Sequence, residues 1–142
     1  MFLIDNSPSK EEYHNDIVKA FTGLSFVAKR IDPDGVELGF LSAPKELYQK
    51  RNISGLIQIV DRHPYSHMSG VPEANLGTFL EKAVHSKLRH WSRRRSLITQ
   101  KILTLFMFTD GNWGEKRPDA AGVQEPIKNL MDTMSKREVA RT

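Results

Sequence analysis

Four oxygen-bearing side chains follow two apolar stretches that are far apart in the chain. Asp5, Ser7 and Ser9 come directly after the apolar residues 2–4, and Asp110 follows a second apolar run. Hard cations such as Mg²⁺ bind oxygen ligands, commonly one or two carboxylates with some retained waters. These residues therefore predict a site for Mg²⁺ or Mn²⁺, provided that the fold brings the two stretches together.

The same side chains also have an interpretation as purely local structure. Ser9 and Glu12 have the S-x-x-E spacing of a capping box, in which a serine stabilises the start of a helix. Asp110 and Gly111 form a common strand-ending turn. The sequence therefore allows two interpretations of these residues, as a metal site and as a helix cap with a turn.

Apolar periodicity predicts strands that alternate with helices. Apolar runs or alternation suited to strands occur at residues 2–4, 36–42 and 101–108. Helical spacing occurs over residues 10–30, 45–61, 76–91 and 123–134, although IQIV in the second range also suits a strand. This order predicts an α/β fold with a mainly parallel sheet, whose ligands bind at the carboxyl ends of the strands. Asp5 and Asp110 would share one edge if their strands are neighbours.

Composition narrows the class of protein. The 142 residues suit one domain, 1–142, with a frayed tail at 135–142, and the 39% hydrophobic and 27% charged content argues against a disordered chain. The lack of cysteine excludes disulfides, thiolate zinc sites and cysteine nucleophiles. No apolar run approaches the ~20 residues of a membrane span. We therefore expect a cytoplasmic protein that does not enter a membrane.

Two motifs resemble those of a known family. DNSPS has the D-x-S-x-S pattern, and LFMFTDG resembles the strand and aspartate that complete the metal-ion-dependent adhesion site of von Willebrand factor type A domains. FLIDNSPS together with DPDGVELGFLS is most similar to intracellular A-like domains of fungal proteins. The resemblance implies a three-layer, Rossmann-like sheet flanked by helices. It also implies that Ser7 and Ser9 bind the ion directly, that Asp5 and Asp110 act partly through water, and that an acidic residue of a partner protein completes the site.

The chain departs from the family pattern at several positions. Ala74 stands where the family has a metal-binding threonine, so Glu73 or Asn75 would have to supply that oxygen and contact the partner. Lys10 follows the serines, and an ammonium near the ion would weaken metal binding. Trp113, close to Asp110, is a further candidate for partner contact. The usual C-terminal strands are also missing, which suggests a truncated domain.

These observations lead to three hypotheses of function. The first is a protein-binding domain that holds Mg²⁺ or Mn²⁺, and the second is the same fold with a metal-free site that binds partners through loops or the sheet edge. The third is a nucleic-acid-binding module that uses the basic residues 87–95 around Trp91. Phosphate-binding and hydrolase motifs are absent from the sequence, so we do not expect an enzyme. His63 and His67 have the spacing of a zinc pair, but Pro64 lies between them and no glutamate accompanies them.

Overall fold

The computed structural model describes residues 1–31, 35–50, 52–67, 72–93, 104–110 and 121–139, without the side chains of 73, 84–93, 121, 122, 134 and 136–139. The chain divides into two compact units. One consists of residues 1–69 and 102–110, and the other of residues 70–101 and 111–142. The prediction of a single domain over 1–142 remains a prediction.

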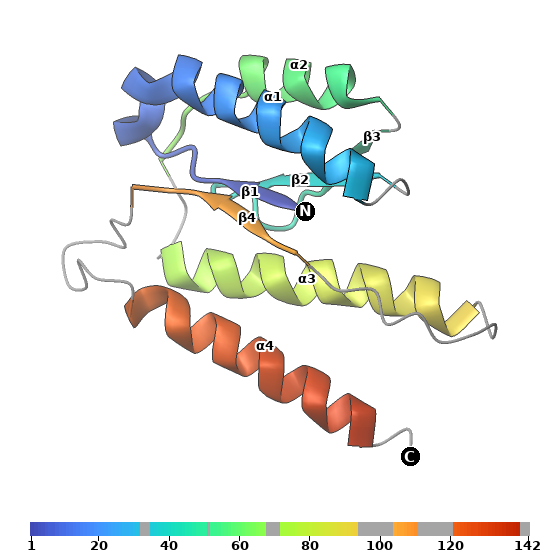
Figure 1. The fold of residues 1–142 in the computed structure, drawn as a ribbon. Helices are drawn as coiled ribbons and strands as arrows, with labels where there is room; N and C mark the ends of the chain where they lie inside the picture. The colour runs from blue at the N-terminus through green and yellow to red at the C-terminus, as the bar shows by residue number, and fades with distance from the viewer. Residues whose placement is uncertain (32–34, 51, 68–71, 94–103, 111–120, 140–142) are drawn as a thin grey trace. The chain divides into compact units, whose positions relative to one another are not determined.

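The first unit is built on a four-stranded sheet with the strand order β3-β2-β1-β4. The strands are β1 (Phe2–Ile4), β2 (Val36–Phe40), β3 (Tyr48–Lys50) and β4 (Phe106–Phe108). β1 pairs in parallel with β2 and with β4, and β3 runs antiparallel to β2. The α/β character and the mainly parallel pairing are confirmed, and β1 lies inside the sheet as its continuous apolar run predicted (Figure 1).

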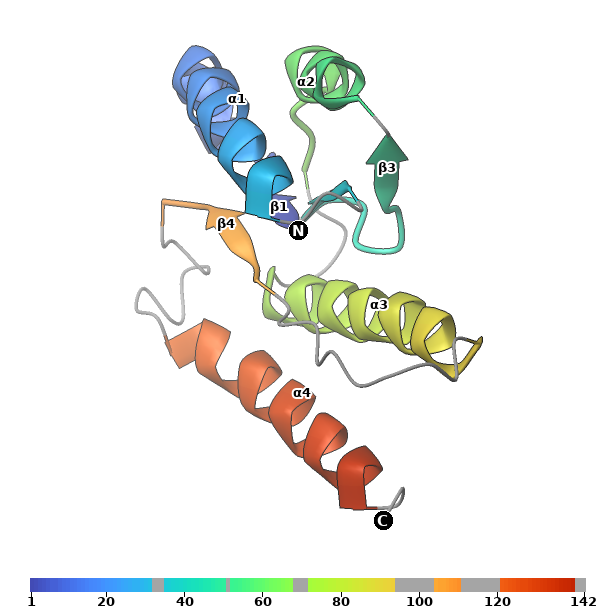
Figure 2. The same ribbon diagram turned by 45° about the vertical axis from the view of Figure 1, so that its right-hand side comes forward.

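Two α-helices cover one face of this sheet. The 3₁₀ helix η1 (Pro8–Tyr13) leads into α1 (His14–Ile31), and α2 (Ile53–Arg62) follows β3. Figures 1 and 2 both show α1 and α2 on the same side of the strands. Alternate residues of β1 and β2 point to this side and form the buried core with the helices, namely Phe2, Ile4, Val36, Leu38, Phe40, Phe21, Leu56 and Val60.

Strand β3 is the main error of the sequence-based prediction. Residues 45–61 were predicted as one helix, but Tyr48–Lys50 pairs with β2 and the helix begins only at Ile53. The side chain of Asn52 accepts a hydrogen bond from the Gly55 amide at 2.8 Å, so this N-cap sets the start of α2. IQIV lies within the helix, and the three-residue strand before it is too short to show a period of its own.

The second unit contains two helices that contact each other, α3 (Pro72–Arg93) and α4 (Ala121–Val139). α3 contains the helix predicted at 76–91, and α4 contains the helix predicted at 123–134. α4 continues past Ser135 to Val139, so the described part of the tail that was predicted to fray is helical. No helix in the described part of the chain combines the length and the apolar character that a bilayer span requires.

Candidate functional site

The carboxyl ends of β1 and β4 lie side by side. Ile4 is in register with Phe108, and the Asp5 amide donates a hydrogen bond to the Phe108 carbonyl at 2.9 Å. The segments that follow the two strands therefore leave the sheet at the same edge. The predicted neighbourhood of Asp5 and Asp110 is present, because their strands are adjacent and parallel.

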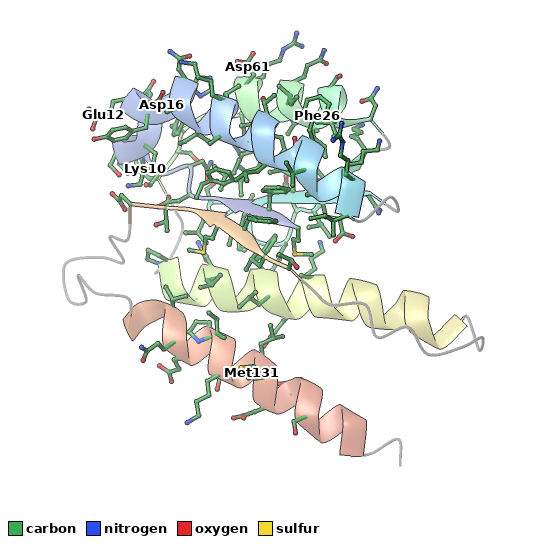
Figure 3. All side chains as sticks on the ribbon, viewed as in Figure 1. Lys10, Glu12, Asp16, Phe26, Asp61 and Met131 are labelled. Carbon is green, nitrogen blue, oxygen red and sulfur yellow. The ribbon has the colours of Figure 1, made fainter. Side chains whose placement is uncertain are left out.

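An ammonium group lies between these two carboxylates. Lys10 is only 4% exposed, and its Nζ donates to Ser9 Oγ at 2.7 Å and forms an ion pair with Asp110 Oδ2. The same Nζ lies 4.0 Å from Asp5 Oδ2. Figure 3 labels Lys10 beside the carboxyl end of β4. Three of the four predicted metal ligands thus surround a lysine ammonium.

The path of the chain after β1 brings Lys10 to this position. Asp5 Oδ1 accepts a hydrogen bond from the Ser7 amide at 3.0 Å, which turns the chain at the end of the strand. Ser7 is extended, and Pro8, with its fixed φ, begins η1. The first turn of this 3₁₀ helix then carries Lys10 back over the strand ends, where burial and two carboxylates hold its charged group.

The capping-box interpretation of Ser9 is wrong. Ser9 lies inside η1, where Ser7 and not Ser9 is the N-cap residue, and the Ser9 Oγ is 3.2 Å from Ser7 Oγ and bonded to Lys10. Glu12 instead forms a hydrogen bond with Tyr13, which raises the pKa of that phenol above its ordinary value. Ser9 therefore binds the Lys10 ammonium and Ser7 contacts Ser9, while α1 begins later, at His14.

The described residues do not fit a bound Mg²⁺. Such an ion needs oxygen ligands at about 2.1 Å in octahedral geometry. Here the Lys10 ammonium is bonded to Ser9 and Asp110 and lies near Asp5, so a divalent cation would meet a like charge among its own ligands. The described part of the chain also contains no group of three or more acidic or histidine side chains arranged to hold a metal.

Asn6 is an important residue that the sequence analysis missed. It is buried, its Nδ2 donates to Ser42 Oγ at 2.7 Å and to the Pro64 carbonyl at 3.1 Å, and its Oδ1 accepts from the Ser42 amide at 3.1 Å. Its carbonyl also accepts from the Ser66 amide. Asn6 therefore joins the segments that follow β1, β2 and α2. A polar residue two positions after the end of a buried strand was the only signal that could have suggested this role.

The histidines near this edge have structural contacts. The His63 ring stacks on Phe40 with a centroid distance of 3.5 Å, and burial lowers the pKa of His63. His14 Nδ1 lies 3.1 Å from Tyr65 Oη, and its Nε2 lies 3.6 Å from Asp61 Oδ1. His63 thus packs against the core.

The remaining candidate residues belong to the second unit or lie outside the described residues. Ala74 is exposed and Asn75 is buried near the start of α3, and the Glu73 side chain is not described. Trp113 lies outside the described residues. Of the basic run 87–95, residues 87–93 continue α3 without described side chains, and 94 and 95 lie outside the described residues.

Comparisons of the chain with protein-family models, with curated proteins and with solved structures found no match.

Proposed function

We propose that this chain is a metal-independent protein-binding domain of the von Willebrand factor type A kind, in which the Lys10 ammonium takes the place of a bound cation. The proposal includes the three-layer, Rossmann-like arrangement and an intracellular setting. The strand order β3-β2-β1-β4 and the polar motifs after β1 and β4 support the fold assignment. The absence of cysteine supports the setting.

The observation that carries the proposal is the position of the Lys10 ammonium. It is buried, it contacts Ser9 and Asp110, and it lies within ion-pair distance of Asp5. A buried ammonium is stable only where opposite charges and hydrogen-bond acceptors surround it, and these groups provide both. The cluster is therefore held together without a metal ion, by a cation that belongs to the chain.

Replacing a divalent ion by one ammonium also changes which kind of partner residue this edge of the sheet can bind. A divalent ion would balance both carboxylates and still attract an acidic group of a partner into its open coordination position. One ammonium leaves the pair of carboxylates with a net negative charge, and its donors are directed at Ser9 and Asp110. The proposed domain therefore does not capture an acidic partner residue through a metal, and it binds through another surface.

Protein binding is preferred to catalysis because both carboxylates of this edge are engaged by groups of the chain itself. A carboxylate nucleophile or general base would have to be available to a substrate. Asp5 accepts from the Ser7 amide and faces Lys10, and Asp110 is ion-paired with Lys10. Both carboxylates thus have a structural role at the strand ends.

Thermal unfolding in millimolar Mg²⁺ and in chelator tests the metal-independent half of the proposal. A functional site with metal at ~100 times its dissociation constant would add about 2.7 kcal/mol to the free energy of unfolding. We expect the same melting temperature in both conditions for the wild-type chain. A rise in Mg²⁺ that Asp5→Ala abolishes would overturn the proposal and favour the metal-binding hypothesis.

Two further measurements sharpen this test. Lys10→Ser removes the ammonium while leaving the four predicted ligands, so we expect this variant, unlike the wild type, to gain a Mg²⁺-dependent rise. The protein-binding half is tested by capture on the immobilised chain, where the same partners should be retained in Mg²⁺ and in chelator. Partners that bind only in Mg²⁺ would contradict the proposal.

A further inference from the structure

Helix α1 has an exposed apolar stripe beside its buried face. Leu24, Val27 and Ile31 are 38%, 54% and 78% exposed, and Ala20 is exposed one turn before Leu24. Residues three, four and seven positions apart lie on one side of a helix, so these four side chains form a continuous line. We call Ala20, Leu24, Val27 and Ile31 the α1 stripe.

Gly23 lies beside the centre of the α1 stripe. A Cβ atom added at this glycine would meet nothing within 4 Å, so packing within the chain does not require a glycine here. Glycine inside a helix is also unfavourable relative to alanine. Because glycine has no side chain, Gly23 allows the backbone of another helix to approach closely beside the α1 stripe.

The charges at the rim of the α1 stripe are complementary in an antiparallel pairing. Asp16 is exposed in the first turn of α1, where Lys19 Nζ lies 4.0 Å from its Oδ1, and Arg30 is exposed in the last turn. Asp16 and Arg30 both lie on the same side of the stripe as Gly23. When two copies of a helix pair antiparallel about a two-fold axis, a residue that lies before the axis in one copy faces the residue that lies equally far after the axis in the other copy. An axis near positions 23 and 24 brings Asp16 of one copy opposite Arg30 of the other.

The same axis also pairs the apolar residues of the two α1 stripes with one another. It places Ala20 opposite Val27 of the second copy, so that a small side chain meets a larger one, and it places Leu24 next to its own copy at the centre. Charge pairing, side-chain size and the position of Gly23 thus agree on one register.

We infer that α1 pairs with α1 of a second copy of this chain, antiparallel, through the α1 stripe. This inference rests on the proposed function, because it names a second copy as a protein partner and the α1 stripe as the surface. The α1 stripe contains no residue of the Lys10 cluster, so we expect the pairing to be independent of metal.

Sedimentation analysis of the full chain over a range of micromolar concentrations tests the pairing. We expect a monomer–dimer equilibrium for the wild type, and we expect Leu24→Asp to weaken the dimer by about tenfold or more, because the buried charge would face its own copy. Phe26→Asp is the matched control. Phe26 is also exposed on α1 (Figure 3), but it lies two positions from Leu24 and therefore on another side of the helix.

Charge reversal tests the register. Asp16→Arg and Arg30→Asp should each weaken the dimer, and the double variant should restore it because the opposite charges face each other again. Gly23→Gln should weaken the dimer without lowering the melting temperature of the monomer. A dimer that survives Leu24→Asp, or a double variant that is not restored, would overturn the pairing.

A wild-type chain that is monomeric at every concentration would also overturn the pairing, and it would leave the proposed metal independence unaffected. A dimer together with a Mg²⁺-dependent melt would have the opposite meaning: it would support the pairing and contradict the metal-independent function. Circular dichroism of each variant establishes that a lost dimer is not a lost fold.

Discussion

The Lys10 ammonium is ion-paired with the Asp110 carboxylate, which lies one hundred positions further along the chain. This contact connects the first turn of η1 with the segment that follows β4. β4 is only three residues long, and it is bonded to β1 through Phe106–Phe108. The ion pair therefore adds a side-chain link where the backbone ladder is short, and it makes the attachment of β4 depend on Lys10.

Lys10→Met should lower the free energy of unfolding. Breaking a fully buried ion pair costs about 3–5 kcal/mol, and we expect about 2–3 kcal/mol here because the Asp110 side chain is 38% exposed and water will solvate it. Urea unfolding of the full chain measures the change. Lys45→Met, at an exposed lysine, is the control and should stay within about 0.5 kcal/mol of wild type. Equal stability of the two variants would mean that the ammonium contributes nothing.

Asn6→Ala should be destabilising through lost hydrogen bonds. The substitution removes three hydrogen bonds from the buried Asn6 side chain to the partly buried Ser42 and the exposed Pro64, which we expect to cost about 2–3 kcal/mol. Asn15→Ala, at an exposed asparagine of α1, provides the comparison. The role assigned to Asn6 is incorrect if both substitutions leave the urea midpoint in place.

The stacked position of His63 on Phe40 predicts a pH dependence of stability. Burial lowers the pKa of His63 in the folded chain below the ordinary value of about 6.5 that it has when unfolded. As the pH falls through 6.5, the unfolded chain binds the proton first, so the free energy of unfolding decreases until the pH reaches the lower pKa of the folded state. This contribution to stability is complete above pH 6.5.

Chemical denaturation at several pH values between 7.5 and 5 measures this dependence. His63→Gln should flatten the decrease, because glutamine does not titrate. His67→Gln, four positions further on at an exposed site, should keep it. Identical slopes for the two variants would assign the dependence to other groups.

Two helical glycines should respond oppositely to alanine. At Gly23 the added methyl group has open space, so we expect a gain of about 0.5–1 kcal/mol in the stability of the monomer from helix propensity. At Gly55 it would lie 2.9 Å from Asn52 Oδ1, the oxygen that caps α2, so we expect a net loss of up to about 1 kcal/mol. Thermal melts at low protein concentration measure both, and a gain at Gly55 would show that the cap can shift without cost.

Local sequence signals were sufficient for the elements that have a clear period. The apolar run at 2–4 and the alternation in Val36–Phe40 identified β1 and β2, and helical spacing identified α1, α3 and α4. The order of these elements also predicted that Asp5 and Asp110 leave one edge, since adjacent parallel strands end on the same side. β3 was not predicted, because its three residues form a strand only through pairing with β2 and show no period of their own.

The sequence by itself therefore determined the α/β class and the polar residues at the strand ends. It also drew attention to Lys10, but not to where the ammonium lies, because a long flexible side chain can point to solvent or into the cluster. Only the tertiary structure decided this, since the turn through Ser7 and Pro8, the burial of Lys10 and the distant Asp110 act together. Oxygen ligands suit a metal ion and an ammonium equally well, so the choice between them depends on three-dimensional packing and not on residue type.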